Sequence, residues 1–192
     1  RYARATDNFH ELFISRKDGR KNPHITSIIE RRNGDLWIAT SGQGAISLKK
    51  NSNPASFHIE TELTDRIGSN YLNVIFEDSD GDLWYGTNNG ISVYDTRKQR
   101  WKHFLDNQEN KAVILCFCED KDGNIWTGGY GVGAFRIDKQ SGKIHSLLHQ
   151  KGANASGTFD AYHIYAMYAD DENLWLGSLD KSMIQYLSLI HI

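Results

Sequence analysis

Proline and cysteine are both scarce in this chain, and each occurs only twice among its 192 residues. The two cysteines, Cys116 and Cys118, stand two positions apart, so in a β-strand they would point to the same face. No second pair of Cys or His residues completes a zinc site, and two cysteines in one strand do not make a disulfide framework. We therefore predict that both are small buried hydrophobic residues, with no metal site and no cofactor.

The chain also lacks an excess of charge of one sign and a long apolar run. It has 22 Lys and Arg against 24 Asp and Glu, for a formal net charge of −2. This balance leaves no basic footprint for nucleic acid or for an anionic membrane. No apolar run approaches the roughly 20 residues that cross a bilayer. We predict no nucleic-acid partner and no membrane contact by this segment.

Glycine and aromatic residues are abundant, with 17 Gly, 5 Trp, 9 Tyr and 8 Phe, which favours many short strands. Four segments align, each an apolar stretch followed by a turn and a tryptophan. The intervals between these tryptophans are 47, 42 and 49 residues, and a period in the forties is typical of β-propeller blades. We expect the four side chains to pack between blades; they are Trp37, Trp84, Trp126 and Trp175.

Each repeat is predicted to form four strands. A tight turn with glycine follows the first strand, because Asn-Gly and Asp-Gly dipeptides tolerate positive φ. The second strand carries the tryptophan and, two positions later, a small residue that lets the neighbouring blade approach closely. The turn glycines are Gly34, Gly81 and Gly123, and the fourth repeat has no glycine in its turn.

The predicted fold class is all-β, a β-propeller of four consecutive four-stranded blade repeats over 1–186. A last strand of a preceding blade is expected over 9–14. With it, the strands would also suffice for a closed four-bladed ring, but we favour an open fragment of a larger ring. The segment 187–192 resembles the translation of a sequencing adapter, so we interpret it as a non-native tail. The blades are expected at about 24–61, 70–105, 112–149 and 162–186.

The repeats resemble the two-component regulator propeller family. Its pattern of a strand, an Asp/Asn-Gly turn, Leu-Trp-Ile-Gly-Thr and a glycine-rich loop is seen in Gly34-Asp-Leu-Trp-Ile-Ala-Thr40 and in Gly81-Asp-Leu-Trp-Tyr-Gly-Thr87. Shorter or varied copies stand in the third and fourth repeats, so that the resemblance covers residues 9 to 186.

The resemblance implies a function. In that family such blades form the periplasmic sensor region of Bacteroidetes-type hybrid two-component histidine kinases, which detect oligosaccharides and control polysaccharide-utilisation genes. It therefore implies an oligosaccharide ligand, further blades of the same chain, a homodimer in the full-length receptor and a periplasmic location. No kinase motif stands in this stretch, so the fragment itself is expected to be no enzyme, and the kinase would lie outside it.

The loops between the second and third strands are the candidate ligand site. They should cluster on one face of the propeller, and their amides and aromatic ring suit sugar hydroxyls and sugar faces, although exposed loops are polar in any case. The candidate ligand-binding residues are Gln43, Asn88, Asn89, Tyr130 and Asp180.

Two other function classes stay open at this point. A carbohydrate-active lyase or hydrolase would need an acid and base constellation on one face, and the sequence gives no catalytic residues for one. A non-catalytic protein-interaction propeller would bind a protein on the same face. The aspartates of Asp78-Ser-Asp-Gly-Asp82 are in the wrong spacing for a calcium loop, and we interpret them as turn residues.

Overall fold

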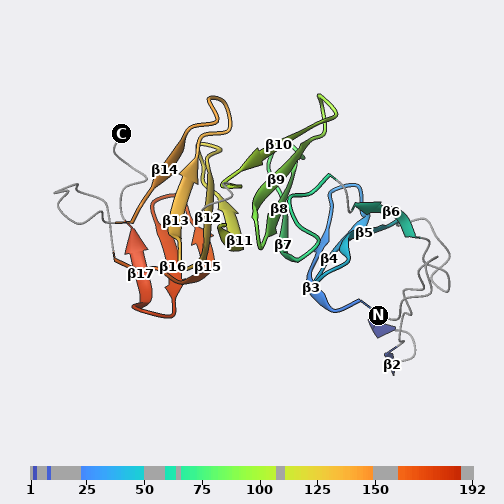
Figure 1. Cartoon of the computed structure of the whole chain (residues 1–192), viewed down its shortest axis with the longest axis horizontal. Coiled ribbons are helices and arrows are strands. Elements are labelled where there is room, and N and C mark those ends of the chain that lie inside the picture. Colours follow the sequence, from blue (N-terminus) through green and yellow to red (C-terminus); the bar gives the residue numbers. More distant parts are fainter. Residues whose placement is uncertain are drawn as a thin grey trace.

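The computed structural model describes residues 23–49, 66–106, 111–148 and 160–186, together with the backbone of strands 2–3, 8–9 and 59–63. Every described element is a β-strand, and consecutive strands pair antiparallel within successive sheets. The sheets stand side by side along an arc, with the chain running from blade 1 to blade 4 (Figure 1). The all-β propeller prediction is confirmed.

Four sheets correspond to the four predicted repeats. Blade 1 contains β3 (Ile25–Glu30), β4 (Leu36–Thr40), β5 (Gly44–Leu48) and β6 (Ile59–Leu63). Blade 2 contains β7 (Leu72–Glu77), β8 (Leu83–Thr87), β9 (Gly90–Asp95) and β10 (Arg100–Phe104). Blade 3 contains β11 (Val113–Glu119), β12 (Ile125–Tyr130), β13 (Gly133–Ile137) and β14 (Ile144–Ser146). Blade 4 contains β15 (Ile164–Ala169), β16 (Leu174–Ser178) and β17 (Ser182–Tyr186).

The N-terminal end has a small hairpin, in which β1 (Tyr2–Ala3) pairs with β2 (Asn8–Phe9). The strand expected over 9–14 therefore falls within the described residues only at Phe9, and 10–14 lie outside them. The segment 187–192 also lies outside the described residues.

The first strand of every blade has a β-bulge near its start, at the second residue in blades 1, 2 and 4 and at the third residue in blade 3. The pairing register with the second strand shifts there in all four sheets. In two blades the extra residue binds the next blade: Thr26 Oγ1 donates to the carbonyl of Leu72 at 2.8 Å, and Asn73 Nδ2 donates to that of Ile114 at 2.9 Å. The bulge therefore aims a side chain across the seam between blades.

Neighbouring blades pack through aliphatic side chains in the first strand of one blade. These side chains lie against a glycine in the second strand of the blade before it. A Cβ added to Gly86 would lie 2.8 Å from Ile114, and one added to Gly128 would lie 2.6 Å from Ile164. Such approaches exclude any larger residue, so the small position after each tryptophan sets the spacing of the blades. Apolar clusters fill each of the three seams.

The two ends of the arc are open. Ile28 of blade 1 is 57% exposed, whereas Ile75, its equivalent in blade 2, is 2% exposed against blade 1. At the other end Tyr168 of blade 4 is 65% exposed, whereas its equivalent Cys118 is 9% exposed. Among the described residues blade 4 does not pack on blade 1, so the four described blades form an open arc, as predicted, and not a closed four-bladed ring (Figure 1).

Three of the repeat tryptophans, Trp37, Trp84 and Trp126, lie within the packing between blades, as predicted, whereas Trp175 does not among the described residues. Trp84 and Trp126 are buried, while Trp37 and Trp175 are half-buried. Trp175 faces the open side of blade 4, which explains its greater exposure. The turn glycines Gly34, Gly81 and Gly123 all have φ near +80°, which glycine adopts without strain.

Candidate ligand-binding face

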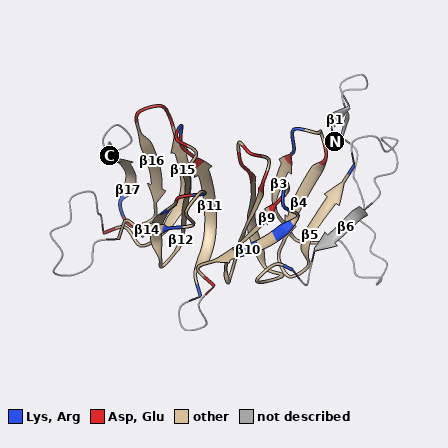
Figure 2. Cartoon of the chain, turned by 90° about the horizontal axis from the view of Figure 1, so that it is seen from above, with Lys and Arg blue, Asp and Glu red and all other residues tan. Residues whose placement is uncertain are grey.

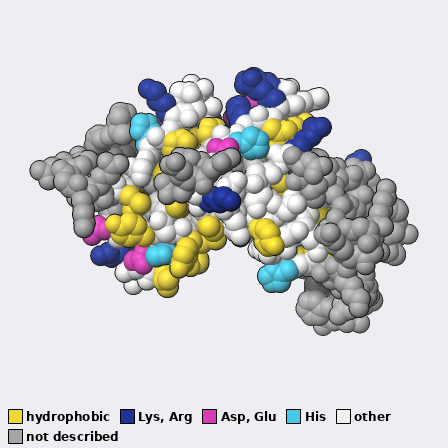
Figure 3. All heavy atoms as spheres, viewed as in Figure 1, with side chains coloured by type: hydrophobic (Ala, Val, Ile, Leu, Met, Phe, Trp, Pro, Cys, Tyr) yellow, Lys and Arg dark blue, Asp and Glu magenta, His cyan; other side chains and the backbone are white. Residues whose placement is uncertain are grey.

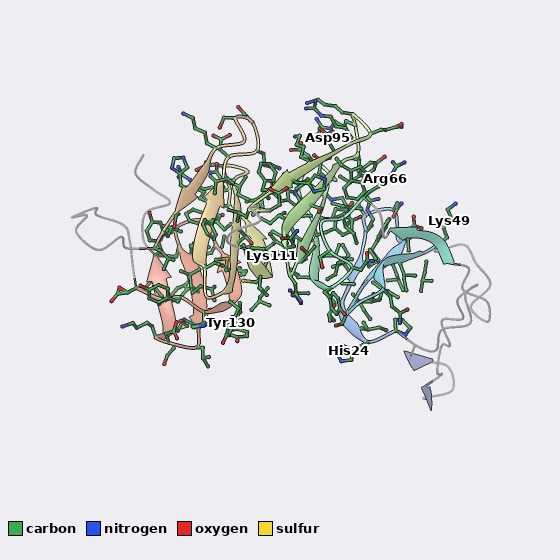
Figure 4. The ribbon with its side chains drawn as sticks, viewed as in Figure 1. His24, Lys49, Arg66, Asp95, Lys111 and Tyr130 are labelled. Atoms are coloured by element: carbon green, nitrogen blue, oxygen red, sulfur yellow. The ribbon has the colours of Figure 1, made fainter. Side chains whose placement is uncertain are left out.

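The two edges of the arc differ in their chemistry. One edge, here called the turn edge, carries the turns after the first and third strands of each blade. The opposite edge, here called the loop face, carries the loops between second and third strands and the connections between blades. Asp and Glu gather mainly on the turn edge (Figure 2). Tyr130 and His24 both lie at the loop face, whereas Asp95 lies toward the turn edge (Figure 4).

Aspartates on the turn edge hold the turns together. Asp78 Oδ1 accepts the backbone N–H groups of Asp80 and Asp82, both at 2.9 Å, and its Oδ2 accepts the indole N–H of Trp84 at 2.9 Å. Asp120 and Asp170 repeat the indole contact in blades 3 and 4. The interpretation of these aspartates as turn residues is confirmed, and their role toward tryptophan was not foreseen.

Charged groups on the turn edge are mutually neutralised. Lys139 of blade 3 lies 2.7 Å from Glu119, 2.9 Å from Asp80 and 3.3 Å from the buried Asp78. Burial alone would lower the pKa of Lys139, but hydrogen bonds to Glu119 and Asp80 raise it well above its ordinary value. Arg31 makes a similar link from blade 1 to Glu77 of blade 2.

A groove of about 560 Å³ opens on this edge between blades 2 and 3. Its lining has five basic and five acidic side chains above Trp84 and Phe104. Three of the bases, at 3.6 to 3.8 Å, surround the buried carboxylate of Asp95. The pKa of Asp95 lies below its usual range, and the largest cause is the hydrogen bond from the backbone N–H of Lys98. The acidic and basic charges of the groove therefore balance, and the groove offers no net charge to a ligand. The charged residues that line it are Asp80, Asp82, Asp95, Asp122, Asp138, Arg97, Lys98, Arg100, Lys102 and Lys139.

The predicted ligand residues all lie on the loop face, one or two to each blade. Gln43 is half-buried in the loop after β4. Asn88 is exposed and its Oδ1 accepts a hydrogen bond from Asn73 at 2.9 Å. Asn89 donates through Nδ2 to the carbonyl of Gly68 at 3.2 Å, while its buried Oδ1 has no hydrogen-bond partner within the part of the chain that the structure describes.

Two of the predicted residues come together at the seam of blades 3 and 4, and a residue that was not predicted joins them. The ring of His163 lies 4.4 Å from that of Tyr130, centroid to centroid. Nδ1 of His163 lies 2.9 Å from Oδ1 of Asp180. The bond from His163 is the first cause that holds the pKa of Asp180 below its usual range. Gln43, in blade 1, and Asn88 and Asn89, in blade 2, do not belong to this cluster.

His163 could have been found from the repeat alignment. It stands just before Ile164, and the equivalent positions are Tyr71, just before Leu72 in blade 2, and Val113, just before Ile114 in blade 3. Within the described segments there is no group of three or more His, Cys, Asp or Glu side chains that could hold a metal ion.

Comparison with protein families decides what these repeats are. The model of the two component regulator propeller matches residues 19–42, 66–89 and 108–131, which span the tryptophan turns of the first three blades. Three of the four repeats therefore match the two-component regulator propeller family. The prediction made from the Gly-Asp-Leu-Trp segments is confirmed. No curated protein matches the chain significantly.

Solved structures share the fold of the repeats. The extracellular domain of a hybrid two-component system from B. thetaiotaomicron superposes with a TM-score of 0.71 at 22% identity, over 92% of this chain and 24% of that one. A second such domain from the same organism gives 0.59 at 18% identity, over 88% and 25%. Virginiamycin B lyase from Staphylococcus aureus gives 0.55 at 18% identity, over 91% and 57%. The chain spans about a quarter of the length of these two extracellular domains.

The described part of the chain has no helix with the length and apolar character that crossing a membrane requires.

Proposed function

We propose that this chain is part of the periplasmic ligand-sensing region of a hybrid two-component histidine kinase, and that its ligand is an oligosaccharide. The family match of three repeats carries the proposal, and extracellular domains of hybrid two-component systems are among the similar structures. The kinase core would lie outside this sequence, which holds no catalytic residue of its own in this proposal.

The loop face suits the ligand. Rigid strands present loops that differ in sequence from blade to blade, which is how propellers and barrels commonly build binding sites. Amide groups at Asn88 and Asn89 and the ring of Tyr130 match the hydroxyls and apolar faces of sugars. Binding would shift signalling only as far as the ligand's affinities for the two receptor states differ.

Further blades of the same chain would cover both open ends. The exposed Ile25 and Ile28 would meet a preceding blade in the way that Ile114 meets Gly86. At the other end a Cβ added to Gly177 would meet only Ala166 of its own blade, at 3.3 Å or more, so the space for a following first strand is free of described residues. A homodimer of the full-length receptor completes the proposal.

The first test is recovery of the full-length gene from overlapping sequence at both ends. The proposal predicts additional blade repeats, a membrane-spanning helix and a histidine kinase core in the same reading frame. A reading frame with blades but no kinase would overturn the sensor function. Autophosphorylation of the membrane-embedded receptor would then be measured with and without oligosaccharides.

A second candidate is a propeller lyase. Its support is the seam cluster, because a histidine held by a carboxylate beside a phenol has the groups that general acid–base catalysis requires. Incubation of the chain with polysaccharides separates the two candidates, since a lyase releases unsaturated products and a sensor releases none. A protein-interaction propeller would bind neither substrate nor sugar.

A further inference from the structure

The seam between blades 3 and 4 gathers aromatic and hydrogen-bonding side chains on the loop face. Tyr130 ends β12, while His163 and Asp180 come from two loops of blade 4. Tyr130 is 54% exposed, and Tyr162, which directly precedes His163 in the sequence, is 49% exposed. Hydrophobic side chains gather at the lower edge of this half of the molecule, close to a histidine and an acidic residue (Figure 3). Both phenol rings therefore offer accessible surface to a ligand.

The histidine is held in one orientation. Nδ1 of His163 lies 2.9 and 3.0 Å from the two carboxylate oxygens of Asp180. The same carboxylate accepts the backbone N–H groups of Tyr162 and His163, both at 2.9 Å. A carboxylate at Nδ1 favours the tautomer with its proton there, so that Nε2 is left as an acceptor. Among the described residues, Nε2 has no hydrogen-bond partner.

This combination is specific to one seam. At the seam of blades 1 and 2 the equivalent residue is Tyr71, whose ring lies 3.4 Å from the Cβ position of Gly42. At the seam of blades 2 and 3 the equivalent residue is Val113, which has no polar group. Of the three described seams, the one between blades 3 and 4 therefore pairs an exposed aromatic ring with an oriented acceptor.

We propose that this seam is a subsite for one residue of a neutral oligosaccharide. Its apolar ring face would stack on Tyr130 and one of its hydroxyl groups would donate to Nε2 of His163. The negative charge of Asp180 disfavours an acidic sugar at the same place. Because loop and ring are already held by hydrogen bonds, little conformational entropy is lost on binding. The inference rests on the proposed function and narrows its ligand and its site.

Saturation-transfer NMR and titration calorimetry with four named probes test it: xylohexaose, mannohexaose, cellohexaose and hexagalacturonate. The full chain is expected to bind at least one of the three neutral probes. Tyr130→Ala and His163→Ala should each weaken that binding about tenfold, as the loss of one ring contact or one hydrogen bond predicts. Tyr130→Phe keeps the ring and should stay within about threefold of the wild type.

Tyr168→Ala is the matched control, because it removes a tyrosine that is at least as exposed as Tyr130 from the open side of blade 4 and should leave binding unchanged. Binding of a neutral probe that survives both Tyr130→Ala and His163→Ala would overturn the subsite and leave the proposed function standing. Binding of hexagalacturonate alone would overturn the neutral class. If none of the four probes binds, both the subsite and the oligosaccharide ligand of the proposed function are rejected.

Discussion

The carboxylate of Asp120 accepts a hydrogen bond of 2.7 Å from the indole Nε1 of Trp126. Its other oxygen accepts the backbone N–H groups of Asp122 at 3.0 Å and of Asn124 at 2.8 Å. One buried side chain thus shapes the turn and also satisfies the polar atom of the tryptophan that packs against the next blade. The same relationship links Asp78 to Trp84 and Asp170 to Trp175.

Asp120→Ala should lower the free energy of unfolding by about 2–3 kcal/mol, because a buried indole N–H and two turn N–H groups lose their acceptor. Denaturant unfolding of the chain measures it. Asp122→Ala in the same turn is the control, since Asp122 is exposed and should change stability by no more than about 0.5 kcal/mol. Equal losses for the two variants would contradict the assigned role of Asp120.

Two glycines with the same backbone conformation should respond differently to alanine. Gly90 and Gly131 have φ of 78° and 75°, so both substitutions carry the left-handed strain of about 1–2 kcal/mol. A Cβ at Gly90 would also lie 2.5 Å from the backbone oxygens of Phe104 and Leu105, whereas at Gly131 nothing lies within 4 Å. Gly90→Ala should therefore cost more than about 3 kcal/mol, the strain plus the cost of overpacking. Equal losses of melting temperature for Gly90→Ala and Gly131→Ala would show that the end of β10 shifts to make room for the added methyl group.

The stability of blade 4 should depend on acid through Asp170. The indole N–H of Trp175, followed by the backbone N–H of Glu172, lowers the pKa of Asp170 to about 2. An unfolded aspartate titrates near 3.9, so the folded state binds its proton less readily. The stabilisation is thus present above about pH 4 and is lost as the pH falls from there toward 2.

Melting temperatures of the wild type and of Asp170→Asn between pH 6 and pH 2 test this dependence. The difference between the two melting temperatures should shrink as the pH falls from 4 to 2. The other carboxylates titrate alike in both proteins, so their effect cancels from this difference. A difference that stays constant down to pH 2 would rule out the contribution of Asp170.

The two cysteines report on the seam between blades 3 and 4. Both are free, and burial is the first cause that raises the pKa of Cys116 and of Cys118 to about 12. At pH 8 only about one thiol in 10⁴ would be ionised, so a thiol reagent should label the native chain far more slowly than the unfolded chain. Labelling of the native chain at the unfolded rate would mean that blade 4 separates from blade 3.

Sequence patterns predicted the blades because each blade is a local unit. The Gly-Asp turn at Gly81 and the small residue at Gly86 stand at fixed distances from Trp84, so strand order and turn type could be deduced without knowing any neighbour. The bulge was not predicted, because its residue type differs in every blade: Thr26, Asn73, Leu115 and Tyr165.

The candidate site was predicted as a face and not as a cluster. The sequence predicts Tyr130 and Asp180 as ligand residues because both stand at loops between second and third strands. Their meeting point, His163, lies in a connection between blades, whose path follows from the packing of whole sheets. On the turn edge, Asp78 and Asp80 of blade 2 likewise meet Lys139 of blade 3 across a seam.

The sequence by itself determined the repeat, its period, its turns and its strand order, because hydrogen bonding within a blade depends on neighbours that are near in the chain. Only the tertiary structure decided which loops meet, which carboxylate serves which tryptophan or lysine, and that the arc stays open. Every blade carries nearly the same local pattern, so what distinguishes one seam from the next is the side chain that the adjoining blade brings within contact distance.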